Sequence, residues 1–95
     1  MKEGTPVLVT TNFRGVFFGR LKDYEAEREK RTLTLHGCRN VIYWSGKRGF
    51  LGLAADGPQS GSRIGSIAPT VLLHEITSVS VCTDNATEVF EQWKS

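Results

Sequence analysis

The chain has 95 residues, of which 39% are hydrophobic and 23% are charged, and its formal net charge is +2. This length corresponds to one domain, residues 1–95, with the composition of an ordinary soluble globular protein. The net charge is too small to predict nucleic-acid binding from bulk charge, although a local basic patch is compatible with it. No apolar run approaches the ~18 residues of a membrane span, and MKEGTP lacks the apolar segment of a signal peptide. We therefore expect a cytoplasmic protein with no membrane partner.

The first two strands are expected near the N-terminus. PVLVTTN, residues 6–12, is rich in β-branched residues and opens with proline, which suits the first residue of a strand. A short turn over residues 13–15 leads into a second, antiparallel strand over residues 15–24. Gly19 interrupts this second strand and predicts a bend or a bulge there.

A long third strand is expected after a charged segment. EAEREKR, residues 25–31, alternates in the sign of its charges and predicts a solvated hairpin loop that could hold a helical turn. TLTLHG then alternates between apolar and polar residues, and CRNVIYW continues as strand to residue 44. Gly37 predicts a bulge between these two halves.

The second half of the chain mixes helices and strands. GFLGLAADG, residues 49–57, has apolar residues at helical spacing and predicts one or two helical turns that end at Gly57, before a polar loop. Residues 63–69 and 71–82 predict two strands, the second with a bulge near Glu75. An amphipathic helix is expected at the C-terminus, with Asp84 as its N-cap.

The expected fold is mainly β (α+β). It is a small antiparallel sheet, or a partly open SH3- or Sm-like barrel, of five or six strands. One short internal helix and one C-terminal helix complete it.

The cysteines and histidines predict neither a disulfide nor a metal site. Cys38 and Cys82 both lie in apolar, strand-like stretches, where a reducing compartment favours small buried thiols. Together with His36 and His74 they have the chemistry of zinc ligands. They lack, however, the paired CxxC or HxxxH spacing of zinc knuckles. We expect no metal and no other cofactor.

The sequence does not favour catalysis. No serine lies in a GxSxG motif, and no pair of histidines shares a motif. SGKRG is only superficially similar to a phosphate-binding loop, because the GxxxxGK[ST] frame is missing. We expect no catalytic residues and do not expect an enzyme.

The segment YWSGKRG, residues 43–49, favours a binding site for an anion. Its glycines let the backbone approach a ligand closely, its cations can donate to phosphate, and one of its aromatic rings could stack on a base. An arginine in the later loop SGSRIG could close over the same site. The competing interpretation, in which the tryptophan anchors the core and KRG is an exposed turn, stays open. The candidate ligand-binding residues are Tyr43, Trp44, Lys47, Arg48 and Arg63.

Strand alternation sharpens this expectation. Residues 39, 41 and 43 should share one face of the strand, and residues 40, 42 and 44 the other. Apolar residues occur on both faces, so we expect both to be at least partly covered. The three cations should then meet at the rim of a pocket, with one of the two aromatic rings in its wall.

Part of the N-terminal half resembles a known fold. VLVTTNFRGVFFGRLKDY followed by TLTL is similar to the first motif of the Sm-like barrels, in which a bent, glycine-containing second strand precedes a short aspartate turn. Here EAEREKR replaces that turn, and no second Sm motif follows. The resemblance implies a fold, and RNA binding only by analogy.

A more extensive resemblance covers most of the chain. RGVFFG, LTLHGCRNVIYWSG, GFLGLAADG, HEITSV and VCT resemble a small family of uncharacterised proteins encoded by tailed phages and prophages. The conjunction of YWSG with a short LxxLAxxG helix is the most specific element. The family has no established site residues, so the resemblance implies only the setting, which is a phage accessory protein inside an infected bacterium.

That setting suggests a function. Small phage proteins can sequester the cyclic or ADP-ribose-type nucleotides that bacterial immune systems use as signals, and such proteins tend to be compact homo-oligomers with basic, aromatic-lined pockets. We therefore expect a non-catalytic, homo-oligomeric binder of a small anionic nucleotide with an anti-defence role. The alternative is an Sm- or SH3-like module that binds RNA, DNA or a host protein.

Overall fold

The computed structural model describes residues 1–46 and 48–95, and Lys47 lies outside them. Its strands pair only in antiparallel fashion, which confirms the expected mainly β fold. The described part of the chain contains six strands: β1 (Pro6–Thr11), β2 (Gly15–Leu21), β3 (Leu33–Tyr43), β4 (Arg63–Ile64), β5 (Ala68–Leu73) and β6 (Ile76–Val81).

The helices of the described chain are short. They are α1 (Tyr24–Glu27), α2 (Gly49–Asp56) and α3 (Asp84–Gln92), with 3-10 turns at Asn12–Arg14 and Arg28–Lys30. None of the helices in this described part is long and apolar enough to cross a membrane.

The caps of α2 and α3 agree with the sequence to within one residue. As expected, α2 ends at Gly57, whose positive φ of 80° suits a glycine. The N-cap of α3 is Thr83 rather than the expected Asp84, because the Thr83 hydroxyl accepts a hydrogen bond from the Ala86 N–H at 3.1 Å. Asp84 instead occupies the first turn, where its charge complements the helix dipole.

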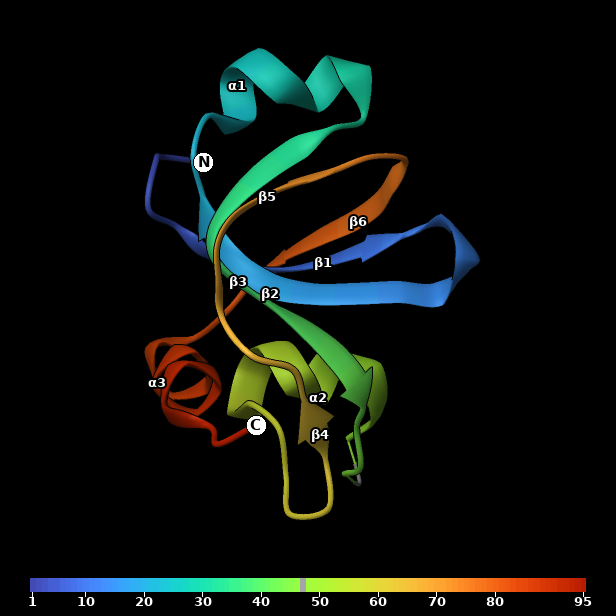
Figure 1. Cartoon of the computed structure of the whole chain (residues 1–95), viewed down its shortest axis with the longest axis vertical. Helices are drawn as coiled ribbons and strands as arrows, with labels where there is room; N and C mark the ends of the chain where they lie inside the picture. Colours follow the sequence, from blue (N-terminus) through green and yellow to red (C-terminus); the bar gives the residue numbers. More distant parts are fainter. Residues whose placement is uncertain (47) are drawn as a thin grey trace.

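The sheet curls into a partly open barrel (Figure 1). The strand order is β4-β3-β2-β1-β6, and β5 pairs with the same strand, β3, as β4 does. Strands β5 and β6 follow each other directly in the chain but pair with β3 and β1, on opposite sides of the sheet. The short link between them therefore draws the two sides of the sheet towards each other.

That link corrects one expectation about the sequence. Residues 71–82 do not form one strand with a bulge near Glu75, because the chain turns at His74 and Glu75 to change sides. Glu75 has a φ of 56°, and its carbonyl accepts a hydrogen bond from the Asn12 N–H at 3.2 Å. The Ile76 N–H donates to the Arg31 carbonyl at 3.1 Å. These bonds fasten the turn to two other parts of the barrel.

The bulge expected at Gly37 is present and bends β3. Phe18 pairs with Arg39 and Arg20 pairs with His36, so two residues of β3 face one residue of β2. Gly37 has a φ of 59°. Gly19 lies opposite this bulge on β2. A Cβ atom there would lie only 2.8 Å from that of Leu35, so the missing side chain of the glycine leaves space for Leu35 to pack.

The sheet has an apolar cluster on each of its faces. The inner cluster fills the barrel and consists of buried residues Val7, Val9, Leu21, Leu33, Leu35, Cys38 and Leu73. The outer cluster lies between the sheet and the two longer helices, and it consists of Leu8, Val16, Phe18, Val41, Leu53, Ala54, Ile64, Cys82, Ala86 and Phe90. Phe18 and Phe90 stack with ring centroids 4.6 Å apart.

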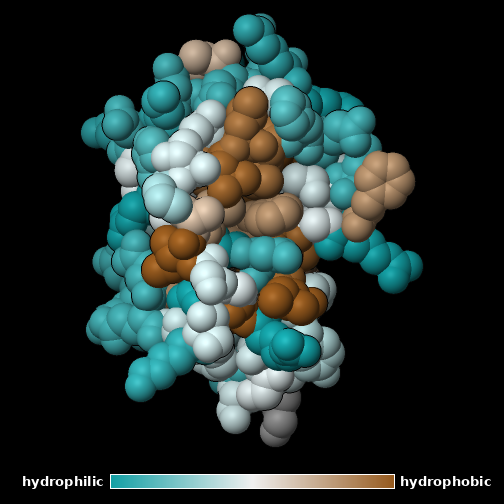
Figure 2. Space-filling model, viewed as in Figure 1, coloured by the Kyte–Doolittle hydropathy of each residue, from teal (hydrophilic) through white to brown (hydrophobic). Residues whose placement is uncertain are grey.

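Apolar side chains also reach the surface. On the face shown in Figure 2, hydrophobic side chains gather over β5 and β6, and the exposed large hydrophobic residues include Ile42, Ile67 and Leu72. Monomeric proteins expose single apolar residues routinely, but a gathering of them on one face is characteristic of contact surfaces.

Candidate functional site

The end of β3 and the loop after α2 are held together by two serines. The Ser45 N–H donates to the Ser62 hydroxyl at 3.1 Å, and the Ser45 hydroxyl donates to the Ser60 carbonyl at 2.7 Å. Trp44 packs edge-on against Phe50 of α2, with ring centroids 6.0 Å apart. These contacts place the end of β3, the helix and its following loop around one hollow.

The hollow has a volume of about 600 Å³. Its described lining consists of four glycines, two serines, Gln59, Leu53, and the charged residues Arg48 and Asp56. Because glycines have no side chain, much of the wall is backbone that a ligand can approach closely. The lining thus combines exposed backbone and apolar surface with one cation and one anion.

Arg48 and Asp56 form an ion pair along α2. Arg48 precedes the helix and Asp56 is its last residue, and the Arg48 Nη1 donates to both carboxylate oxygens at 3.1 Å. The arginine passes close to Gly52, where a Cβ atom would lie 2.7 Å from that of Arg48. The Arg48 side chain is 68% exposed. A pair this exposed contributes little to stability, so a ligand can open it at small cost.

The N-terminus of α2 favours an anion in the same place. Arg48 is the N-cap residue and makes no side-chain capping bond to the helix. The first N–H groups of a helix have no partner within the helix, and they form the positive end of its dipole. Arg48 and Gly49, at this end, both line the hollow. The Arg48 guanidinium itself lies beside Asp56 at the other end of α2, so the arginine and the helix N–H groups border the hollow at different ends of the helix.

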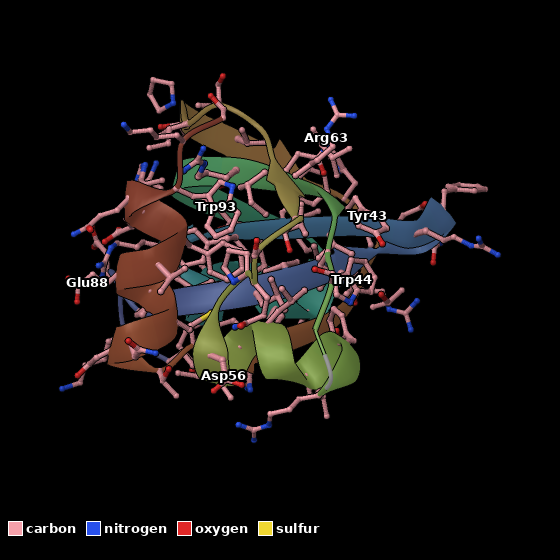
Figure 3. All side chains as sticks on the ribbon, turned by 90° about the horizontal axis from the view of Figure 1, so that it is seen from below. Tyr43, Trp44, Asp56, Arg63, Glu88 and Trp93 are labelled. Carbon is pink, nitrogen blue, oxygen red and sulfur yellow. The ribbon has the colours of Figure 1, made fainter. Side chains whose placement is uncertain are left out.

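The four predicted binding residues that the structure describes do not meet at one place. Tyr43 and Arg63 face each other in the pairing of β3 with β4, and both are exposed. Neither lines the hollow, and Arg63 lies far from Asp56 in Figure 3. Of these four described residues, only Arg48 is among the lining residues. Lys47 lies outside the described residues.

The alternation expected at the end of β3 also fails. Arg39 and Val41 are buried as a pair, but Tyr43 is 56% exposed and Trp44 packs against the outer cluster that contains Val41. The pairing with β4 shifts register between Val41 and Tyr43, and β3 ends there, so the period of two is lost. On the other face Ile42 is 55% exposed, so this end of the strand is only partly covered there.

Arg39 is a buried residue whose role the sequence did not reveal. It is 2% exposed, and its guanidinium donates to the carbonyl oxygens of Gly65, Phe90 and Trp93 at 2.7, 2.8 and 2.6 Å. Burial lowers its pKa. Two of these carbonyls lie at the C-terminus of α3, the negative end of the helix dipole, so the helix partly balances the buried charge.

The cysteines are buried and free, as expected. Burial raises the pKa of Cys38 to about 11 and that of Cys82 to about 12, so both thiols stay protonated at neutral pH. Cys38 lies in the inner cluster and Cys82 in the outer one. The His36 ring hydrogen-bonds to the Thr70 hydroxyl at 3.1 Å. Among the described residues, no three His, Cys, Asp or Glu side chains group to hold a metal.

Comparison with known proteins identifies a family. Residues 4–90 match the model of a family described as "Domain of unknown function (DUF6948)". No curated protein and no solved structure matches the chain.

Proposed function

The chain belongs to the DUF6948 family, and we propose that it is a non-catalytic protein that binds a small anionic nucleotide in the hollow beside α2. One observation carries the proposal: an exposed arginine, Arg48, and the uncapped start of a helix line the same glycine-rich hollow. Arginine and helix N–H groups are both well-suited partners of protein-bound phosphate.

The size and chemistry of the hollow support this ligand class. Sites for small molecules and cofactors enclose about 300–1,000 Å³, and this hollow has about 600 Å³. A phosphate placed near Arg48 would compete with Asp56 for the guanidinium. The existing ion pair is exposed to water and contributes little, so exchanging the carboxylate for a phosphate costs little.

The biological role we propose is sequestration. A protein that binds a signalling nucleotide without transforming it lowers the free concentration of that nucleotide in proportion to its own amount. The resemblance of the YWSG and LxxLAxxG segments to phage-encoded proteins suggests that the chain acts in an infected bacterium. The ligand would then be a nucleotide signal of bacterial immunity, and the role anti-defence.

A second candidate function rests on a different surface. Tyr43 and Arg63 lie side by side on neighbouring strands, both exposed, next to the exposed Ile42. An aromatic ring beside an arginine on an open surface is a platform on which bases can stack. This arrangement supports the alternative of a module that binds RNA or DNA.

Calorimetric titration with ADP-ribose and a cyclic dinucleotide tests the leading proposal. We expect saturable binding by the wild type, and Arg48→Ala should weaken it about tenfold or more, since a hydrogen bond to a charged group contributes about 1.5–3 kcal/mol. Arg63→Ala is the matched control, because it removes an exposed arginine outside the hollow, and it should bind as the wild type does.

The same titration distinguishes the alternative. A polyanion on an open surface would lose affinity steeply as salt rises, in proportion to the phosphates neutralised. If Arg63→Ala abolishes binding of a single-stranded oligonucleotide while Arg48→Ala retains it, the nucleic-acid function is correct. The proposal for the hollow would then be wrong.

A further inference from the structure

Asp56 is the feature of the hollow that phosphate binding does not explain. It closes α2, where the dipole is negative and a carboxylate is unfavourable, and its only ion pair among the described residues is with Arg48. If a phosphate draws Arg48 away, this carboxylate faces the hollow without a partner. A ligand that also offers hydrogen-bond donors can use this carboxylate, which is 38% exposed and otherwise bonds to water.

The rest of the described lining indicates which part of a nucleotide lies there. No aromatic ring is among these lining residues, and Leu53 is their single large apolar side chain. Trp44 is engaged with Phe50, and Tyr43 lies outside the hollow. Backbone, serines, a glutamine and two charges match a polar sugar and its phosphate, whereas a base would gain no stacking partner from these residues.

We propose that the hollow recognises the ribose phosphate part of its ligand, with Arg48 on the phosphate and Asp56 accepting hydrogen bonds from the vicinal 2′- and 3′-hydroxyls. The inference rests on the proposed function and deepens it. A ribose 5-phosphate carries its anion and its diol on opposite sides of one small ring. The phosphate can therefore bind Arg48 while the diol donates to Asp56. Without a ligand these two residues pair with each other.

The proposal predicts selectivity for the sugar and indifference to the base. The wild type should bind ribose 5-phosphate, AMP, CMP and GMP with similar affinity in calorimetric titrations. It should bind 2-deoxyribose 5-phosphate and dAMP about tenfold more weakly, because the lost hydroxyl leaves the carboxylate under-satisfied.

Asp56→Asn tests the residue itself. The amide still accepts a hydrogen bond but loses the charge, so the preference for AMP over dAMP should fall to about twofold or less, even if phosphate affinity rises because Arg48 is free. Glu88→Gln, at an exposed carboxylate on α3, is the matched control and should keep the wild-type preference. If Asp56→Asn does not fold, the wild-type ratio of the ribo- to the deoxy-compound still decides.

The possible outcomes distinguish failure of the ribose inference from failure of the proposed nucleotide binding. Equal affinity for AMP and dAMP, or binding that depends on the base, would overturn the ribose inference and leave nucleotide binding intact. Unchanged sugar preference in a folded Asp56→Asn variant would show that another group reads the hydroxyls. Absence of binding by every compound would overturn both the inference and the proposed function.

Discussion

Arg39 joins three segments that lie far apart in the sequence. From β3 its guanidinium bonds to the carbonyl of Gly65, in the link between β4 and β5, and to the carbonyls of Phe90 and Trp93 at the end of α3. The bonds to Gly65 and Trp93 supply donors to carbonyl oxygens at the link and at the end of α3, and the Phe90 carbonyl also accepts a bond from the Trp93 N–H. Arg39 therefore acts as a C-terminal cap supplied by a neighbouring strand.

Arg39→Ala should destabilise the protein by about 3 kcal/mol or more. The change removes the side-chain donor of the Gly65 and Trp93 carbonyls and one of the two donors of the Phe90 carbonyl, and an unsatisfied buried polar group costs about 1–3 kcal/mol. Urea unfolding followed by circular dichroism measures the loss. Arg63→Ala, at an exposed arginine on β4, should change the free energy of unfolding by less than about 0.5 kcal/mol. Equal stability of the two variants would show that the Arg39 bonds are not part of the folded state in solution.

Residue burial could be predicted from the sequence only where the side chain itself is apolar. The two cysteines were expected to be buried, and they are. The sequence assigned Arg39 only to a strand face, by alternation. Its hydrogen-bond partners are backbone carbonyls, which every residue has, so no residue type in the sequence indicates them. Asp56 gave a weak signal, an acidic residue just before a helix-ending glycine, but its pairing with Arg48 depends on how closely α2 lets the arginine pass Gly52.

The elements of the N-terminal half follow their sequence patterns closely. β1 begins at Pro6 as expected, and the bulge at Gly37 lies opposite Gly19, where the sequence predicted a bend. In these stretches local propensity, alternation and glycine placement all favour the same structure. Such agreement allows a strand to be predicted without knowledge of its neighbours.

The second half was harder to predict because its strands change partners. Residues 71–82 contain apolar residues in two opposite phases, which one bulged strand and two separate strands explain equally well. Closure of the barrel decides between them, since β5 must reach β3 and β6 must reach β1. The candidate site depends on similar non-local geometry. Tyr43, Trp44 and Arg48 are near neighbours in the chain, yet the end of β3 sends them to different surroundings.

At the scale of the whole molecule, we propose that copies of the chain associate. Both faces of most of the sheet are buried within one chain, but hydrophobic side chains still gather over β5 and β6 (Figure 2). Ile42, Ile67 and Leu72 are each more than half exposed. A second copy of the same chain is the partner that is always present at equal concentration, and most such assemblies have closed symmetry.

Light scattering at micromolar concentration should give a mass above that of one 10.5 kDa chain. Leu72→Glu should lower the mass by placing a charge in the contact, whereas Gln92→Glu, at an exposed position on α3, should not. A wild type that scatters as a single 10.5 kDa chain would contradict self-association and leave the hollow, which lies within one chain, unaffected.

The central claim is that the hollow beside α2 is the ligand site, and amide chemical-shift mapping tests it most directly. Titration of the isotopically labelled protein with ADP-ribose should shift the amide signals of Gly46, Gly49, Gly52, Gln59 and Ser60, which all line the hollow. The signals of Tyr43 and Arg63 should stay in place, because these residues lie outside it. Shifts centred on Tyr43 and Arg63, or no shifts at millimolar ligand, would contradict the claim.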